Sequence, residues 1–433
     1  ISDSPKITTG FGNVAREIYQ GFIEEGFHLQ VIGFLDTEPD VNNELPYGFW
    51  PVTVTNAIPQ DLILHVIQTF KPDVVWLMID PGNVGRIVNY LAGLKVLAIT
   101  KKIDVPDFKI VVYPPVEGTP INAYAINGFN KIEQTGGRVV FWTKSSLENA
   151  KRYGQKLKAN DYIYFGMDHA PFKEYSEEDK QLLRKMAGLG DKFVIGSVGV
   201  NKRTKGLEKL IYTARELMQR GYEDAFVFYL HTDADNPVFS GYPLKDLKQA
   251  YGVERMVLFK PDSNGDLRGN NYRGVARSGN ILNYIKSDEF VEPTTAEERR
   301  DLFAQYSFID RMNCLDLYVD LSEVEGWGMP IGEAMACGVP TMWLNDWDVR
   351  TEIYGGVGIE LTPIEEELWS TWHTGARLVH VDYRYVADKI EKIFLEDPDF
   401  TELKAKQKAL TELYKWDYAR LTMNKIIKEV HNG

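Results

Sequence analysis

The chain alternates short apolar runs with longer amphipathic segments. Strand candidates rich in β-branched and aromatic residues lie at residues 29–34, 74–79, 109–113, 138–142, 162–165, 193–198, 226–231, 256–259, 317–320, 341–344 and 358–361. Between them apolar positions recur at helical spacing, as in residues 14–25, where Val14, Ile18 and Phe22 share one face. Strands that alternate with amphipathic helices are typical of a parallel sheet covered by helices. The pattern therefore predicts an α/β fold with two doubly wound halves.

The two series of strands predict two domains that face a central cleft. We place the first domain at residues 1–172, a polar linker rich in Glu, Asp and Lys at 173–192, and the second domain at 193–410. Ligands of open α/β sheets bind beyond the carboxyl ends of the strands, so a ligand is expected between the domains. Residues 262–297 interrupt the second series with Gly, Asn, Ser and Arg, and we interpret them as an inserted functional loop.

The composition limits the class of protein. Of the 433 residues, 44% are hydrophobic and 26% are charged, which is typical of soluble globular proteins. The net charge of −13 argues against a general nucleic-acid binder, because such affinity depends on clustered Lys and Arg. No apolar run is long enough to span a bilayer, and Cys314 and Cys337 have no metal-binding spacing. We expect both to be buried reduced thiols in a cytoplasmic protein.

The richest motif is the segment EGWGMPIGEAMACGVP, which covers residues 325–340 and follows the strand candidate at 317–320. Glycines at 326 and 328 remove Cβ atoms where a backbone must approach a ligand closely. The helix after them presents free N–H groups and the positive end of its dipole to an anion such as a diphosphate. Glu325 in the loop is placed to reach a sugar, and Glu333 in the helix to accept hydrogen bonds from ribose hydroxyls. The motif therefore predicts a nucleotide-sugar site.

This segment resembles the signature of the retaining GT-B glycosyltransferases of family 4, EGFGLPxxEAMACGxP, and differs from it by Trp327 and Met329. The resemblance implies two Rossmann-like domains and transfer of a sugar from a UDP- or GDP-sugar to an acceptor hydroxyl. It also implies that Glu325 contacts the donor sugar, that Glu333 holds the ribose, and that the backbone N–H groups of Gly328 and Met329 meet the phosphates. It further implies that Gly326 and Trp327 belong to the same donor-binding loop.

A basic element precedes the helix at residues 207–220 and resembles GRxxxxKG, in which Arg and Lys grip the two phosphates. Lys205 and Gly206 match the family pattern, but Val200 stands where the family has its Arg. We expect Arg203, and with less support Lys202, to take the place of that Arg. Basic groups at this position stabilise charge as it develops on a diphosphate leaving group.

Three weaker likenesses extend the match. A turn with Gly10 and Gly12 lies where the family has a Gly-rich loop that lines the cleft. Lys260 stands where the family has a Gly after the strand whose backbone reads the nucleotide base. The sequence at Trp416 resembles the start of the helix that crosses back, so residues 411–433 are expected to pack on the first domain.

The candidate base departs from the family pattern. Many relatives have a His after the strand equivalent to 109–113, whereas this chain reads PPVEGTP. Glu117 is the ionisable residue there, and a carboxylate can accept the proton of an acceptor hydroxyl. Asp80, which ends a neighbouring strand, is a second candidate for contact with the acceptor.

Asp233 and Asp235 spell a metal-binding DxD pattern, but we interpret them as a polar loop. We expect neither an obligatory metal nor another obligatory cofactor.

Other readings remain open at this point. An NDP-sugar epimerase or a phosphorylase can use the same architecture, and Val200 and the absent His also suit a non-catalytic nucleotide-sugar-binding protein. The acceptor is not named by the sequence and is a glycan, a protein or a small molecule. Aromatic residues of the first half are scattered and its charge is not basic, so a soluble acceptor is favoured, while peripheral contact with a membrane stays open.

Overall fold

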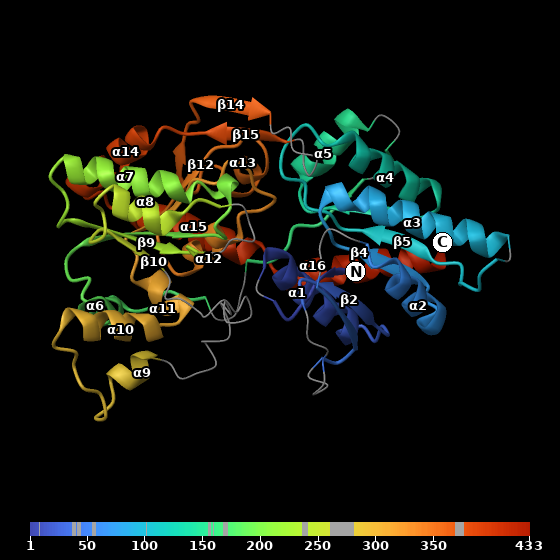
Figure 1. Ribbon diagram of the computed structural model, residues 1–433, viewed down its shortest axis with the longest axis horizontal. Helices are drawn as coiled ribbons and strands as arrows, with labels where there is room; N and C mark the ends of the chain where they lie inside the picture. Colours follow the sequence, from blue (N-terminus) through green and yellow to red (C-terminus); the bar gives the residue numbers. More distant parts are fainter. Residues whose placement is uncertain are drawn as a thin grey trace.

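The computed structural model describes residues 1–433 except 8, 37–39, 41–44, 54–57, 101, 155–156, 159, 168–171, 236–240, 260–280 and 369–375, and of residues 365–368 it describes only the backbone. The described chain forms two α/β units that lie side by side (Figure 1). We call the unit built on strands β1 to β7 the first unit and the one built on β8 to β13 the second unit. The limits that the sequence suggests at 172, 193 and 410 stay predictions.

The sheet of the first unit is entirely parallel. Its strands are β1 (Ser2–Asp3), β2 (Gln30–Phe34), β3 (Gly48–Val52), β4 (Val74–Leu77), β5 (Lys109–Val112), β6 (Arg138–Phe141) and β7 (Asp161–Tyr162). Parallel pairing orders them as β1-β2-β3 and β4-β5-β6-β7, and a bridge from Ser2 to Met78 joins the two sets. The order is therefore β3-β2-β1-β4-β5-β6-β7, with β1 at the point where the winding direction reverses.

Strand β3 was not predicted from the sequence. It contains Pro51, which has no N–H to donate to a sheet, and all five of its residues are only half-buried. A proline of this kind is tolerated on an edge strand, and β3 pairs with β2 alone. The strand therefore lacks the apolar alternation on which the sequence prediction depends.

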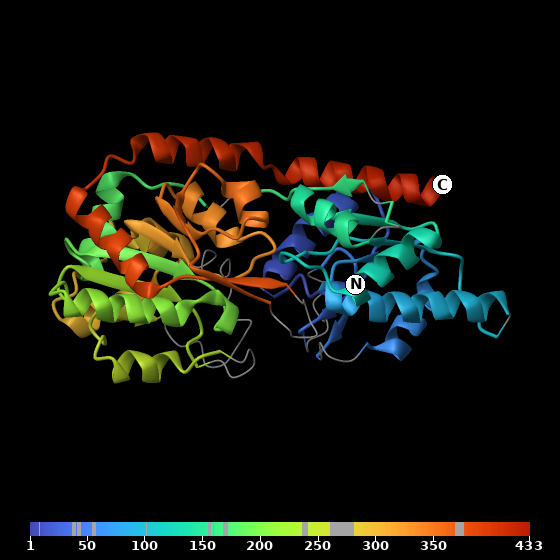
Figure 2. The same ribbon diagram turned by 90° about the horizontal axis from the view of Figure 1, so that it is seen from above.

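Helices cover both faces of the first sheet (Figure 2). They are α1 (Gly10–Glu24), α2 (Gln60–Phe70), α3 (Pro81–Ile99), α4 (Ala123–Gln134) and α5 (Lys144–Tyr153). Thr9 is the N-cap of helix α1, and its side chain accepts a hydrogen bond from the N–H of Gly12 at 3.0 Å. Its predicted apolar face is buried, since Val14 and Ile18 are fully enclosed and Phe22 is nearly so.

The second unit has a parallel sheet of the order β10-β9-β8-β11-β12-β13. Its strands are β8 (Phe193–Val198), β9 (Phe226–His231), β10 (Val257–Phe259), β11 (Leu317–Asp320), β12 (Thr341–Leu344) and β13 (Ile359–Leu361). The helices around it are α7 (Leu207–Gln219), α8 (Leu244–Ala250), α11 (Phe308–Asn313), α12 (Met329–Ala336), α13 (Val349–Tyr354) and α14 (Tyr383–Glu396). An antiparallel hairpin of β14 (Glu365–Leu368) and β15 (Arg377–His380), which the sequence did not predict, adds to this unit.

The polar stretch between the units contains a helix. Helix α6 (Glu177–Met186) buries Leu183 and Met186, and the Leu183 carbonyl accepts a hydrogen bond from the Tyr306 hydroxyl at 2.8 Å. Tyr306 follows helix α10 (Ala296–Gln305), so α6 packs with the second unit. In the predicted insertion, residues 281–297 contain helix α9 (Ile281–Ile285), whose three isoleucine and leucine side chains are buried, and the start of α10. Residues 262–280 of that insertion lie outside the described residues.

The last two helices cross from one unit to the other. Helix α15 (Thr401–Leu413) lies beside α12, and helix α16 (Trp416–Asn432) runs along the first unit (Figure 2). Arg420 pairs with Glu17 of α1 at 2.5 Å, and Asn424 donates to the carbonyl of Gly21 at 2.9 Å. A Cβ on Gly21 would lie 2.7 Å from the Arg420 side chain, so the two helices meet closely at this glycine. Among the described residues, no helix combines the length and apolar character needed to cross a membrane.

Candidate active site

Helices α1 and α12 bring their N-termini together at the junction of the two units. A Cβ built on Gly10, the first residue of α1, would lie 3.9 Å from the Sδ atom of Met329, the first residue of α12. Gly12 is required for the turn itself, because a Cβ there would lie 2.5 Å from the Ile7 carbonyl oxygen. Two helix dipoles thus present their positive ends to one region, which suits an anion.

The loop between β11 and α12 carries the predicted motif. Gly328 has a positive φ of 83° and caps α12, and its carbonyl accepts a hydrogen bond from the Tyr354 hydroxyl at 2.9 Å. Pro330 lies in the first turn of α12, where its missing N–H costs no hydrogen bond. Glu333 lies one turn further along the helix and is nearly buried.

Lys205 and Glu325 form an ion pair in which the Lys205 Nζ donates to the Glu325 Oε1. Lys205 ends the short 3₁₀ helix η1 (Arg203–Lys205), which follows β8. Burial favours the neutral acid of Glu325, but Lys205 and Arg350 outweigh it and hold the pKa of Glu325 below its ordinary value. Burial likewise opposes the charge of Lys205, but Glu325 and Asp320 raise its pKa. Both groups are therefore ionised at neutral pH.

Gly206 allows the loop that carries Lys205 to approach the loop that carries Glu325. It has a positive φ of 61°, and a Cβ at this position would lie 2.5 Å from the carbonyl oxygen of Leu321. The loops after β8 and β11 therefore contact each other through the backbone at a residue without a side chain.

Glu117 reaches the same region from the first unit. A Cβ on Gly326 would lie 3.2 Å from the Cβ of Pro115 and 3.5 Å from the Cγ of Glu117. Burial raises the pKa of Glu117, Lys202 opposes this rise, and Asp80 adds to it. The structure thus brings together Glu117, Lys205 and Glu325, which the sequence reasoning had chosen separately.

The two candidates for the phosphate-binding cation have different neighbours. The Lys202 ammonium acts on the carboxyl of Glu117. Arg203 instead lies close enough to Glu208 to oppose the effect of burial, which raises the pKa of Glu208 to about 7. Val200, at the position of the family's Arg, is partly exposed. Lys202 is thus the candidate associated with the Glu117 region.

Trp327 lies in an aromatic cluster between the units. Its ring centroid is 4.0 Å from that of Phe165 and 5.6 Å from that of Tyr414, and only 2% of the residue is exposed. Phe165 in turn stacks on Trp416 with an interplanar angle of 9°. The side chain of Trp327 therefore packs the motif loop onto the first unit and the start of α16.

The remaining candidates are dispersed. Lys260 lies outside the described residues. Asp235 pairs with Lys245, and its N–H donates to Asp233 at 3.2 Å, as in a polar turn. No group of three metal-ligating side chains occurs within the part of the chain that the structure describes.

Cys314 and Cys337 are both buried and free, and burial raises the pKa of Cys314 to about 12.

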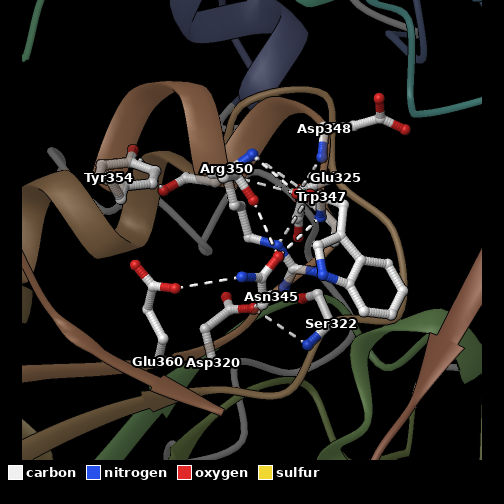
Figure 3. A network of polar contacts seen from close by, with 12 residues as sticks. Asp320, Ser322, Glu325, Asn345, Trp347, Asp348, Arg350, Tyr354 and Glu360 are labelled. Carbon is white, nitrogen blue, oxygen red and sulfur yellow. Dashed lines mark hydrogen bonds and ion pairs between the residues drawn. The ribbon is translucent and has the colours of Figure 1, made fainter. Parts of the chain in front are cut away.

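The sequence reasoning did not identify Arg350, which lies beneath Glu325. Its guanidinium is fully buried and donates to Asp346 at 3.0 Å and to Asp320 at 3.1 Å (Figure 3). Figure 3 shows Arg350 at the centre of this network, with Glu325 close by. The only sequence signal is the spacing of four residues between Asp346 and Arg350, which is equally typical of an exposed helical ion pair.

The sequence matches no protein-family model and no curated protein. Several solved structures are nevertheless similar over nearly the whole chain. A glycosyltransferase from Rickettsia africae ESF-5 is 14% identical and has a TM-score of 0.61, covering 96% of this chain and 94% of that one. Sucrose-phosphate synthase from Thermosynechococcus elongatus is 15% identical, with a TM-score of 0.61 and coverages of 98% and 94%. HepE from Anabaena, in complex with UDP-glucose, is 13% identical, with a TM-score of 0.63 and coverages of 99% and 98%.

At these identities the likeness establishes the fold alone. The neighbours are GT-B glycosyltransferases, and the parallel sheets of both units agree with them. The predicted fold, with two Rossmann-like units, is therefore confirmed.

Proposed function

We propose that this protein is a retaining glycosyltransferase that transfers a sugar from a nucleoside-diphosphate sugar to an acceptor hydroxyl. The observation that carries the proposal is the ion pair of Lys205 with Glu325, set beside the paired N-termini of α1 and α12. This arrangement supplies a cation and free N–H groups for a diphosphate next to a carboxylate for a sugar. A fold shared with HepE, whose solved complexes contain UDP and UDP-glucose, favours a UDP-sugar as the first donor to test.

The donor would bind mainly to the second unit. The N–H groups of Gly328 and Met329 would meet the phosphates, and Glu333 would accept hydrogen bonds from the ribose. Lys205 would leave its pairing with Glu325 in part to contact the diphosphate. Glu325 would then accept hydrogen bonds from the sugar hydroxyls. Preorganised groups of this kind stabilise the charge that develops on a leaving diphosphate.

The chemical step breaks the bond between the anomeric carbon and the phosphate oxygen. The electron pair goes to the diphosphate, where Lys205 and the α12 dipole stabilise it, so no metal is required. Arg203, the second cation that the sequence favours, would have to turn from Glu208 to join them. The acceptor oxygen attacks from the face that the diphosphate leaves, and the configuration is retained. Glu117 takes the acceptor proton, a role that its raised pKa favours because the basicity of a carboxylate increases with its pKa.

A donor panel followed by turnover of one variant tests the proposal. Thermal shifts with UDP-, GDP- and ADP-sugars identify the donor, and acceptor panels then reveal transfer. Glu325→Gln is expected to lower kcat by about 100-fold or more, because a donor contact that strengthens in the transition state is lost. Glu402→Gln on the exposed face of α15 is the matched control. Full turnover by a folded Glu325→Gln variant would sink the assignment.

The same assays separate the alternatives. A donor consumed or isomerised without any acceptor would indicate an epimerase, and sugar 1-phosphate formed with inorganic phosphate would indicate a phosphorylase. Tight binding without turnover over all acceptors would indicate a non-catalytic protein.

A further inference from the structure

The loop before α13 is organised around the carboxylate of Asp346. Asp346 accepts hydrogen bonds from the N–H groups of Asp348 at 3.0 Å and Arg350 at 3.1 Å, and from the Arg350 Nε at 3.0 Å. It therefore caps the N-terminus of α13 and holds the Arg350 side chain at the same time. Trp347, which lies between Asp346 and Asp348, has a positive φ of 54°, which is unusual for a bulky residue. The loop has one strongly specified conformation.

The inner side of α13 faces Glu325. Arg350 spans from Asp346 to Asp320, and its charge lowers the pKa of Glu325. Its Nη2 atom is buried and has no hydrogen-bond partner among the described residues, although the other two guanidinium nitrogens are used. A fully buried arginine without its complete set of partners is costly, so this unpartnered nitrogen needs an explanation.

The outer side of α13 faces the first unit. The Glu352 carboxylate accepts hydrogen bonds from the N–H groups of Lys144 at 2.9 Å and Ser145 at 2.5 Å, at the N-terminus of α5. It also accepts one from the hydroxyl of Tyr164, which follows β7. A carboxylate at a helix N-terminus is stabilised by the free N–H groups and by the dipole. Glu352 thus docks the second unit onto the first.

Asp348 adds to this contact. Its carboxylate points away from Arg350 (Figure 3) and accepts hydrogen bonds from the Asn149 side chain at 3.1 Å and the Thr119 hydroxyl at 3.2 Å. Thr119 lies two residues after Glu117. The same short segment therefore contacts both α5 and the loop that carries the candidate base.

We propose that α13 couples the contact between the two units to the orientation of Glu325, with Arg350 as the positioning residue and Glu352 as the docking residue. Arg350 and Glu352 lie two residues apart on one helix, so a shift of the helix moves both. When Glu352 is docked, Arg350 lies against Asp320 beneath Glu325. When the units separate, α13 is released and Arg350 loses this position. The role of Glu325 in transfer rests on the proposed function, but the coupling itself does not.

The kinetic test uses Glu352→Ala, Arg350→Met and a matched control. Glu148 lies on α5, where its exposed side chain pairs with the Lys144 ammonium at 3.6 Å, so Glu148→Ala changes the same helix and leaves the hydrogen bonds from the backbone N–H groups to Glu352 in place. Glu352→Ala and Arg350→Met are each expected to lower kcat by about 10- to 100-fold, the effect of a displacement of roughly 1 Å at a reacting centre. The donor KM and the UDP affinity should change by less than about two-fold, because the phosphate contacts stay in place.

Two further variants of Arg350 distinguish a positioning role from a failure to fold. Lys retains the charge without the planar fork, so Arg350→Lys should recover only part of the lost kcat. If Arg350→Met does not fold, because Asp320 is left buried and unpaired, the variant Asp320→Asn/Arg350→Met takes its place. An unchanged kcat in the folded Arg350 variants would overturn the positioning role.

A second measurement does not need turnover. Spin labels at Arg152→Cys on α5 and Lys392→Cys on α14 report the distance between the units, and both native cysteines are buried and should not label. Double electron–electron resonance should give a broader distance distribution for Glu352→Ala than for wild type and Glu148→Ala. An unchanged distribution would overturn the docking role.

The titration of Glu325 completes the test. Carbon-13 NMR of labelled glutamate, assigned with Glu325→Gln, should show a higher pKa for Glu325 in Glu352→Ala because Arg350 moves away. The groups that face Glu325 are Lys205, Asp320, Arg350, Glu117, Tyr318 and Tyr354. An unchanged pKa together with a broader distance distribution would refute the coupling. Absence of turnover by wild type on every donor would instead refute the proposed function. The coupling between the unit contact and the position of Arg350 would still be tested by the distance and pKa measurements.

Discussion

The ammonium of Lys205 and the carboxylate of Glu325 form an ion pair that joins two loops 120 residues apart in the sequence. Their side chains are 22% and 12% exposed, so water screens the pair less than it would at the surface. Glu325 is also held by Arg350, and Lys205 also faces Asp320. The pair is thus one part of a buried set of charges whose balance contributes to stability and, under the proposed function, to donor binding.

Removal of the Lys205 charge alone should lower the stability of the protein more than removal of both the Lys205 and the Glu325 charges. Lys205→Met leaves Glu325 partly uncompensated and is expected to cost on the order of 3 kcal/mol, whereas Lys205→Met/Glu325→Leu should recover part of that loss. Thermal unfolding of the ligand-free protein measures the difference between the two variants. Equal melting temperatures for both would show that the pair makes no contribution as a unit.

The same pair should give a defined pH window. The lowered pKa of Glu325 means that its stabilisation is present above its unfolded value of about 4.3 and is lost as the pH falls through the folded value. The raised pKa of Lys205 means that its stabilisation is present below about 10.4 and is lost as the pH rises through the folded value. The melting temperature of wild type should exceed that of the double variant most between these limits. A constant difference at acid pH would contradict the assignment.

Glu117 should control the acid limb of the activity profile. Its raised pKa means that it is protonated at a pH where an ordinary carboxyl is ionised, so kcat should fall as the pH is lowered through this raised value. Lys202 opposes the rise, and Lys202→Met should therefore move the limb to higher pH, while Lys102→Met on the surface should not move it. Glu117→Gln is expected to lower kcat by about 10²- to 10⁴-fold with unchanged UDP affinity. A normal profile in Glu117→Gln would identify another base.

Much of the fold could be predicted from the sequence because buried parallel strands are continuous apolar runs. The predicted strands at 193–198, 226–231, 317–320 and 341–344 match β8, β9, β11 and β12 at both ends. The half-buried edge strand β3 and the hairpin of β14 and β15 carry no such pattern, and the sequence did not reveal them. Helix α6 was interpreted only as a polar linker, because just two of its ten residues are buried.

The site could be predicted only where its residues are close in sequence. Glu325 and Glu333 belong to one loop and helix, and their spacing indicates a common ligand. Trp327 was assigned to the donor from its place in that motif, yet its ring packs on Phe165, which is 162 residues away. The role of Arg350 likewise depends on the approach of Asp320 from β11, a tertiary contact that no local pattern reports.

Asp3 should make stability depend on pH near neutrality. Burial raises the pKa of Asp3 to about 7, the hydrogen bond from Thr9 opposes this rise, and Asp80 adds to it. The native state thus keeps a proton that the unfolded chain releases above about pH 3.9, and stability should fall from there until the pH passes about 7. In Asp3→Asn this fall in stability should be absent. The melting temperature of the variant minus that of wild type should therefore increase between pH 4 and about 7. A parallel course for both proteins would contradict the raised pKa.

Gly206 offers a test of the contact between the loops that carry Lys205 and Glu325. Gly206 and Gly190 have similar positive φ values of 61° and 54°, but a Cβ on Gly190 would meet nothing within 4 Å. Gly190→Ala should therefore cost only the strain of the left-handed backbone, about 1 kcal/mol. Gly206→Ala should cost about 1–3 kcal/mol more, because its Cβ would force the Leu321 carbonyl away and separate the two loops. Thermal unfolding measures both variants, and UDP titration should show weaker binding for Gly206→Ala alone. Equal destabilisation and equal UDP affinity in the two variants would mean that the close approach at Gly206 does not position Lys205.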